Sequence, residues 1–195
     1  MEPVQTDPFA RFQNLFERAS ATEPFAGARA ALATVSDSGE PSVRFVLVKG
    51  HADSGFEFFT NYGSPKAQDL EATGVAALAW HWDSIGVQVR ARGTVRRVSA
   101  GRSDAYFASR PRGSQIGAWA SEQSSPIASR ESLEARYHAF EKRFEGADVP
   151  RPPHWGGYLL APSRVEFWKE GDYRLHDREL YERAGAMWRV TRLAP

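Results

Sequence analysis

A twenty-residue stretch that begins at Tyr106 holds the densest collection of side chains that could bind an anion. It reads YFASRPRGSQIGAWASEQSS and combines two arginines, a tyrosine, a tryptophan, two glutamines and several hydroxyls. A phosphate group needs several converging donors, and Arg110 can supply a charged fork while Tyr106 and Ser114 supply hydroxyls. The same residues also fit a solvated helix-turn-helix surface with Ile116 and Trp119 docked into a core. Composition alone favours that second interpretation, because arginines on helices are usually solvated.

A second candidate anion site lies in the segment Thr60–Lys66, which reads TNYGSPK. A strand that ends in a glycine turn and opens a capped helix presents free backbone N–H groups at the positive end of the helix. Lys66 adds a positive charge there. The segment lacks the glycine spacing of a Walker loop, so it predicts a phosphate site of another kind.

The segment RFVLVK places two cations on one predicted strand. Strand alternation sends Arg44 and Lys49 to different faces. Spacing alone favours an edge strand with solvated ends.

A third group of polar side chains follows the sequence EFW in the last quarter of the chain. If residues 174–178 are extended, then Arg174, His176 and Arg178 point the same way, which packing alone does not explain. A single histidine beside Asp177 is more often a surface hydrogen-bonding pair than a catalyst. The five histidines show no metal-binding spacing and no GxSxG elbow occurs, so neither a metal site nor a serine hydrolase is predicted.

Local patterns predict the elements that must position these groups. Asp7 and Pro8 form a helix start, and apolar residues then recur at helical spacing, which predicts a docking helix over about 8–20. β-Branched and small residues between turns predict strands at 30–35, 42–48, 56–60, 75–82 and 87–98, with a short helix from Ser64 to about Ala72. Further helices are expected at 99–109, 114–120 and 129–144, and four closing strands at 155–160, 164–169, 174–182 and 187–193.

Short antiparallel strands therefore dominate a single predicted domain over residues 1–195. Closing such a meander into a barrel removes its exposed edges. We expect a mainly β protein with flanking helices, in which barrel strands occupy about 29–98 and 155–193 and a helical segment occupies about 99–145.

Composition excludes several other classes of protein. The 195 residues are 42% hydrophobic and 25% charged, with a net charge of +1, which gives no bulk attraction to nucleic acid or to an acidic membrane. The absence of cysteine excludes disulfides, thiolate catalysis and cysteine-bound metal. No apolar run approaches the length of a membrane span, and we expect a cytoplasmic protein.

Taken in order, these clusters resemble the pyridoxamine 5′-phosphate oxidase family over nearly the whole chain. The similarity runs from DPF at Asp7 to RLAP at the end of the sequence, and it includes the motifs RxVLxK, TNxGSxKA, YFxSRPRxSQIGAWxSxQSS, WGG and EFWxxGxxRLHDR. Several of these motifs are long and nearly unbroken, so their joint occurrence by chance is very improbable.

The resemblance implies a split β-barrel homodimer that binds FMN at the subunit interface. Arg44 and Lys66 would contact the FMN phosphate. The other implied FMN contacts are Lys49, Phe59, Thr60, Gln88, Trp168 and Arg178, joined from across the dimer by Gln123 and Ser124. The substrate phosphate would be held by Lys49, Tyr106, Arg110 and Ser114. Arg174 and His176 would lie over the pyridine ring as the catalytic pair.

The implied reaction is oxidation of pyridoxamine or pyridoxine 5′-phosphate to pyridoxal 5′-phosphate. O₂ is the final acceptor and gives H₂O₂, and the amine also releases ammonia. No metal, nucleic acid or membrane takes part. Pro65 stands where many members carry an arginine, and Phe59 replaces a common tyrosine, so flavin affinity is expected to differ from that of those members.

Two other functions remain open at this point. One is a related flavin oxidase of a larger aromatic substrate, as in phenazine synthesis. Such relatives tend to lose the SRPRxSQIG segment, which is complete here. The other is a non-catalytic protein that binds a flavin or a B6 vitamer on the same barrel, which the intact Arg174 and His176 disfavour.

Overall fold

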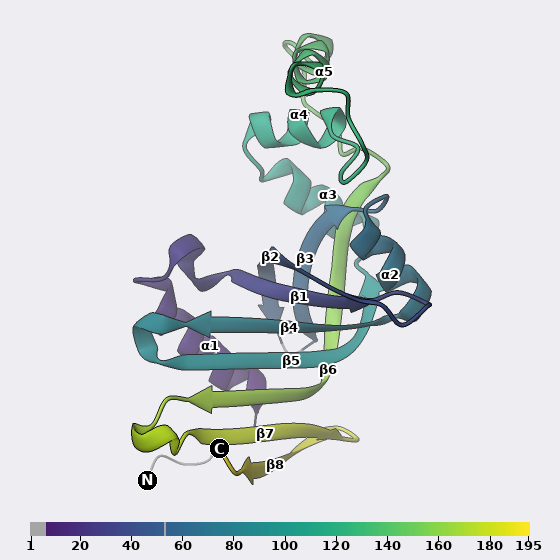
Figure 1. The fold of residues 1–195 in the computed structure, drawn as a ribbon. Helices are drawn as coiled ribbons and strands as arrows, with labels where there is room; N and C mark the ends of the chain where they lie inside the picture. The colour runs from purple at the N-terminus through teal and green to yellow at the C-terminus, as the bar shows by residue number, and fades with distance from the viewer. Residues whose placement is uncertain (1–6, 53) are drawn as a thin grey trace.

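Eight antiparallel strands form one sheet in the computed structural model, which describes residues 7–52 and 54–195 (Figure 1). The strands are β1 (Arg29–Val35), β2 (Pro41–Ala52), β3 (Gly55–Asn61), β4 (Val75–Trp82), β5 (Val87–Arg97), β6 (Trp155–Lys169), β7 (Asp177–Ala184) and β8 (Met187–Leu193). They follow the order β3-β2-β1-β4-β5-β6-β7-β8, and β3 also pairs with β6. That extra pairing closes six strands into a barrel and leaves β7 and β8 as an extension. The predicted split barrel is therefore confirmed.

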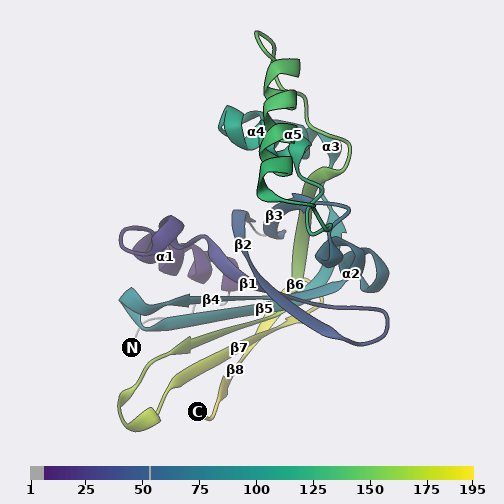
Figure 2. The ribbon, with the colours of Figure 1, turned by 45° about the horizontal axis from the view of Figure 1, so that its top comes forward.

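The described residues also form five α-helices: α1 (Pro8–Ser20), α2 (Pro65–Thr73), α3 (Ala100–Ala108), α4 (Arg112–Ala120) and α5 (Arg130–Arg143). Short 3-10 turns occupy Pro24–Gly27, Asp83–Ile85 and Asp172–Arg174. Figure 2 shows α1 and α2 on opposite sides of the barrel, while α3, α4 and α5 stand together beyond one end of it. Among the helices described, none has the length and apolar character needed to cross a membrane.

The largest core lies inside the barrel and continues under α1. Phe12 is only 1% exposed, and its ring centroid lies 4.8 Å from that of Phe56 and 4.9 Å from that of Trp80. A second, smaller core joins Phe107 of α3 and Ile116 of α4 to Trp155 at the start of β6. The helical segment therefore packs on the barrel through one end of β6.

One long strand replaces two of the four closing strands that the sequence predicts. Residues 155–160 and 164–169 belong to the continuous β6, whose first half pairs with β3 and β5 and whose second half pairs with β5 and β7. Pro162 lies where the β5 register shifts between Arg92 and Gly93, and a proline is tolerated at such a bulge because it has no N–H to donate. A Cβ on Gly93 would lie 2.0 Å from the Ala161 carbonyl oxygen, so the strands approach closely only because this residue is glycine.

The start of α1 is capped as the sequence predicts. The Asp7 carboxylate accepts a 2.9 Å hydrogen bond from the backbone N–H of Phe9, and Pro8 is the first helical residue. We expect Asp7→Ala to lower the free energy of unfolding by about 1 kcal/mol, since one N-terminal donor loses its partner. Chemical denaturation measures this loss. Gln13→Ala, on the exposed face of the same helix, should change stability much less, and equal losses in the two variants would contradict a capping role.

Candidate functional site

Lys66 is the centre of a polar group that we call the Lys66 cluster: Arg44, Thr60, Ser64, Lys66 and Gln123. The Lys66 ammonium lies 3.2 Å from Thr60 Oγ1, 3.1 Å from Ser64 Oγ and 2.8 Å from Gln123 Oε1. Thr60 Oγ1 also donates to Gln123 Oε1 at 3.0 Å. Lys66 lies in the first turn of α2, where backbone N–H groups at the helix start add positive potential. The cluster can bind an anion.

Gln123 reaches this cluster from its own chain. The resemblance implied that Gln123 and Ser124 act from across a dimer; within this chain Gln123 contacts Thr60 and Lys66. The connection follows from the position of α4, because Asn61 Nδ2 donates to the carbonyl of Ser121 at 3.3 Å. Ser124 is exposed and has a positive φ of 71°.

Arg44 is held in the Lys66 cluster by the hydroxyl groups of Thr34 and Ser42, which sequence reasoning missed. Its guanidinium donates to Thr34 Oγ1 at 2.6 Å and to Ser42 Oγ at 2.5 Å. Thr34 is 4% exposed and donates in turn to Asp69 Oδ2 at 2.5 Å. Only the pairing of β1 with β2 and the docking of α2 bring these residues together.

Electrostatics at Lys66 favour binding of a negative group. Burial, followed by the positive charge of Arg44, lowers the pKa of the Lys66 ammonium from 10.5 to about 8. Burial also lowers the pKa of Arg44, and the charge of Asp69 opposes that shift. A bound anion would favour both protonated forms, since an opposite charge nearby stabilises a cation.

A second group surrounds Arg110, between α3 and α4. The ring of Tyr106 stacks on that of Phe59 at 4.0 Å between centroids, and the Arg110 guanidinium lies 4.8 Å from the centre of the Trp155 ring. The NH1 atom of Arg110 is buried and has no hydrogen-bond partner in the described part of the chain. Burial lowers the pKa of Arg110 and raises that of Tyr106. An unpaired buried donor is costly, so this group is suited to receive an anionic ligand.

The other two residues expected to bind the substrate phosphate are exposed. Ser114 lies in the first turn of α4, four residues after Arg110, and Lys49 lies at the bulge between β2 and β3. Arg44 on β2 lies opposite the buried Leu32 on β1, whereas Lys49 is exposed. These different environments agree with the prediction that Arg44 and Lys49 lie on different faces of the strand. The alternative interpretation, a solvated helix-turn-helix surface, predicts that Ile116 packs in the core, and it does. That interpretation does not fit Arg110, because its NH1 atom is buried.

Trp168 belongs to a third group, which we call the Trp168 row: Gln88, Trp168 and Arg178, which pair directly across β5, β6 and β7. The His176 ring lies 4.5 Å from the Trp168 ring, and His176 Nδ1 accepts from the backbone N–H of Gly171 at 3.3 Å. An open pocket of about 620 Å³ is lined by residues that include Lys169, Arg174 and His176.

The prediction that residues 174–178 form one extended run is wrong. Strand β7 begins only at Asp177, and Arg174 ends a 3-10 turn with φ 64°. Tyr173 before it also has a positive φ of 55°. Two successive left-handed residues without glycine are unfavourable, and such strain is typical of functional loops. Both Arg174 and His176 still line the same pocket.

The first turn of α2, which carries Lys66, and the Trp168 row lie on different sides of the barrel. Helix α2 leads directly into the start of β4, whereas Gln88 pairs with His81 near the end of that strand. Figure 1 shows α2 and the β4–β5 turn on opposite sides of the barrel. No group of three or more His, Asp or Glu side chains that could hold a metal occurs within the described ranges.

Comparison with known protein families identifies both parts of the chain. Residues 23–144 match the family model described as pyridoxamine 5′-phosphate oxidase, and residues 155–195 match that of the pyridoxine 5′-phosphate oxidase C-terminal dimerisation region. The chain belongs to the pyridoxamine 5′-phosphate oxidase family. The resemblance seen in the sequence motifs is thereby confirmed.

Relatives in this family match almost end to end. A pyridoxine/pyridoxamine 5′-phosphate oxidase of Rubrobacter xylanophilus is 51% identical over 97% of this chain and 87% of its own length. The protein of that name from Anaeromyxobacter dehalogenans is also 51% identical, over 97% of this chain and 96% of its own.

Solved structures agree with the fold. PhzG from Burkholderia lata, in complex with tetrahydrophenazine-1-carboxylic acid, superposes with a TM-score of 0.93 at 29% identity, over 100% of this chain and 95% of its own. A pyridoxamine 5′-phosphate oxidase-related, FMN-binding protein of Nostoc punctiforme gives a TM-score of 0.77 at 17% identity, over 98% of this chain and 100% of its own, and shows the shared fold alone.

Proposed function

We propose that this protein is an FMN-dependent oxidase that converts pyridoxamine and pyridoxine 5′-phosphate to pyridoxal 5′-phosphate. The alcohol and O₂ would give the aldehyde and H₂O₂, and the amine would also consume water and release ammonia. The relatives at about half identity carry the corresponding name. The observation that carries the proposal is the buried, unpaired NH1 of Arg110 beside Tyr106, within a complete SRPRxSQIG segment.

The residues present fit FMN. The Lys66 cluster has the donors that a terminal phosphate needs, namely an ammonium, a guanidinium, hydroxyls and a helix start. The Trp168 row offers an aromatic face, an amide and a guanidinium for the ring system. Bound FMN would supply the hydride acceptor at the substrate and the route for electrons to O₂.

The substrate would be oriented through its own phosphate. Arg110 and Tyr106 would hold that phosphate, with Lys49 and Ser114 completing the site. Arg174 and His176 would lie over the pyridine ring and keep the reacting carbon in place. Because the phosphate is remote from the bond that reacts, its binding energy can serve orientation rather than chemistry.

We further propose that the active protein is a homodimer in which one subunit's Lys66 cluster faces the partner's Trp168 row. The position of α2 and of the β4–β5 turn on opposite sides of one barrel supports this arrangement, as does the match to a dimerisation region. The β1–β2–β4 wall is also suited to a flat contact. Val43 is 69% and Phe45 is 73% exposed there, beside small side chains at Ala31, Ala33, Ala77 and Ala79.

A second candidate function is oxidation of a larger aromatic molecule without phosphate. The close superposition with PhzG favours it. An assay in air with FMN-saturated protein separates the two functions. We expect pyridoxine 5′-phosphate to yield pyridoxal 5′-phosphate and H₂O₂ in equal amounts, while pyridoxine without the phosphate reacts very slowly. Equal rates with both compounds would contradict the proposed phosphate site, and no product from either would favour the second candidate.

A further inference from the structure

A buried carboxylate lies directly beside the Trp168 row. Strand pairing places Gln88, Trp168 and Arg178 in one row, and Arg90, Glu166 and Leu180 in the next row on the same face. Glu166 is 7% exposed and borders a pocket of about 350 Å³ that also includes Arg90 and Arg178. Neither Glu166 nor Arg90 has a part in the function proposed above.

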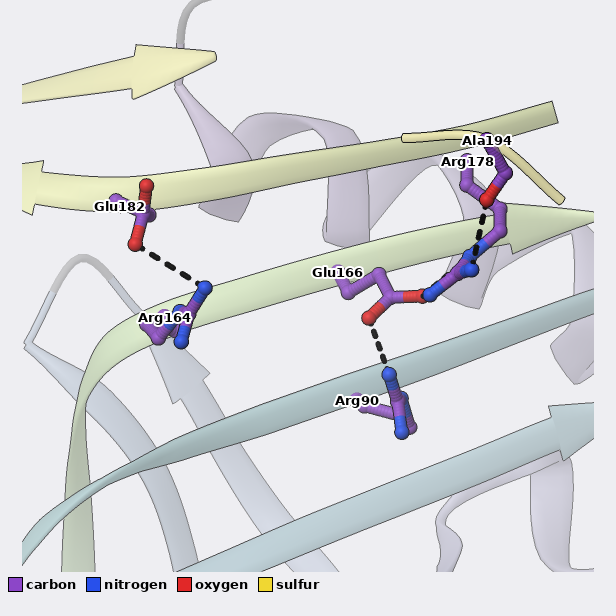
Figure 3. A network of polar contacts seen from close by, with 6 residues as sticks. All are labelled: Arg90, Arg164, Glu166, Arg178, Glu182 and Ala194. Atoms are coloured by element: carbon purple, nitrogen blue, oxygen red, sulfur yellow. Dashed lines mark hydrogen bonds and ion pairs between the residues drawn. The ribbon is translucent and has the colours of Figure 1, made fainter. Parts of the chain in front are cut away.

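Both oxygens of this carboxylate are occupied by arginines (Figure 3). Glu166 Oε1 accepts from Nε of Arg178 at 3.0 Å and from NH2 of Arg178 at 2.9 Å, a two-bond fork. Glu166 Oε2 pairs with NH2 of Arg90. Burial acts to raise the pKa of Glu166, but its hydrogen bonds to the two arginines prevail and lower it, so the group is ionised at neutral pH.

Three hydrogen bonds to the protein therefore hold the guanidinium of Arg178. Its NH1 donates to the carbonyl of Ala194 at 2.8 Å, in addition to the fork on Glu166. An arginine has five N–H donors, so two remain for a ligand. A planar guanidinium with three bonds to the protein keeps one orientation, and those two donors keep a fixed direction beside Trp168.

We propose that Glu166 is a positioning residue for flavin binding: it orients Arg178, and Arg90 in turn holds Glu166. The inference rests on the proposed function, because it takes Arg178 to be a flavin contact. Without the carboxylate, Arg90 and Arg178 face each other as like charges, and Arg178 loses its fork. The two free donors of Arg178 then no longer point in one direction.

The chain offers a matched control on the same two strands. Arg164 on β6 pairs with Glu182 on β7 at 3.2 Å, and neither contacts Arg178 (Figure 3). Glu182 also pairs with Arg189 at 3.0 Å, so Glu182→Gln disrupts two arginine–glutamate pairs without touching the Glu166 fork. Comparison with Glu166→Gln separates positioning from a general loss of charge pairing.

The test is a titration of flavin-free dimer with FMN, followed by quenching of flavin fluorescence. We expect Glu166→Gln to raise the Kd for FMN roughly ten- to a hundredfold, the effect of losing a charged hydrogen bond. Glu182→Gln should change the Kd less than about twofold, because the pairs of Glu182 are partly exposed and do not include Arg178. At saturating FMN, the visible circular dichroism of the bound flavin should change in Glu166→Gln alone.

A double-mutant cycle decides whether Glu166 acts through Arg178. In an Arg178→Gln background, Glu166→Gln should cause no further loss of FMN affinity. Additive losses, or equal losses in Glu166→Gln and Glu182→Gln, would overturn the inference. If Glu166→Gln fails to fold, Arg90→Gln serves as a second variant, because Arg90 is half-exposed. It should show a smaller loss of FMN affinity than the one expected for Glu166→Gln. Wild-type FMN affinity in Arg90→Gln would overturn the role of Arg90 in holding Glu166.

Failure of the inference is distinguishable from failure of the proposed function. Wild-type protein that does not bind FMN would overturn both. Wild-type protein that binds FMN and forms pyridoxal 5′-phosphate, but whose Arg178→Gln variant binds FMN equally well, would overturn only the role of Arg178 and the inference built on it.

Discussion

Arg110→Ala is expected to raise the Michaelis constant for pyridoxine 5′-phosphate on the order of tenfold to a hundredfold while FMN affinity is retained. The loss corresponds to one or more hydrogen bonds from a charged donor to the substrate phosphate. The NH1 of Arg110 makes no hydrogen bond to the described residues, so the unliganded protein loses none at this atom. The variant also loses the contact between Arg110 and the Trp155 ring, so its thermal midpoint should fall by only a few degrees. Steady-state kinetics, FMN titration and a melting curve on one preparation measure the three quantities.

Two further variants sharpen this prediction. Arg110→Lys keeps the charge without the planar fork and should show an intermediate Michaelis constant. Arg130→Ala removes an exposed arginine of α5 that pairs with Glu134, and it should behave as wild type. An unchanged Michaelis constant in Arg110→Ala would remove Arg110 from the phosphate site.

FMN affinity is expected to fall as the pH rises above about 8, because Lys66 then loses its proton. The pKa of Lys66 is about 8 in the unliganded protein, and a bound phosphate would raise it. Binding above that pH therefore takes up a proton, and the Kd should rise by up to about tenfold per pH unit until the pKa of the bound form is reached. Fluorescence titrations from pH 7 to about pH 9.5 cover this window.

Variants and a matched ligand isolate the contribution of Lys66. Lys66→Arg keeps its charge at these pH values and should remove the pH dependence, whereas Lys66→Met should bind FMN weakly at every pH, with a Kd roughly ten- to a hundredfold higher. Riboflavin, which lacks the phosphate, should show little pH dependence with the wild type. The same pH profile in wild type and Lys66→Arg would show that another group titrates.

The same pKa shift has a consequence for stability. The unfolded chain keeps the Lys66 proton up to its ordinary pKa of 10.5, whereas the folded chain releases it near 8. The unfolded state therefore binds more protons between these values, and this residue's contribution to stability rises with pH across that window. Chemical denaturation of the flavin-free proteins at several pH values measures this effect. Between pH 8 and about 10.5, the free energy of unfolding should rise more steeply with pH in the wild type than in Lys66→Met.

Elements set by neighbouring residues were predictable from the sequence. The cap at Asp7 and the Pro8 start produce α1 over the expected residues. Ser99 and Ser129 cap α3 and α5 in the same way, with each hydroxyl accepting a backbone N–H. These signals act within one helical turn and therefore need no tertiary contact. The motif-based family assignment was also correct, since the motifs are contiguous.

Some predictions failed where distant residues decide the outcome. The sequence pattern predicts two strands, 155–160 and 164–169, but pairing with β3, β5 and β7 keeps residues 155–169 in one strand. The pattern also predicts a strand that begins at Arg174, but the chain turns there before β7 begins at Asp177. At Pro162, hydrogen bonding across the sheet outweighs the local preference for a break, and at the start of β7 pairing with β6 begins only at Asp177. The linear pattern reveals neither.

By itself, the amino-acid sequence determined the family, most of the helix starts and the barrel class, and it predicts the residues proposed above to bind phosphate. The tertiary structure alone decided which of them meet. It brought Gln123 to Lys66 within one chain, placed Thr34 and Asp69 behind Arg44, and set Glu166 between Arg90 and Arg178. The physical reason is strand register: a side chain's face follows from alternation along its own strand, but its partner depends on which residue of another strand lies opposite.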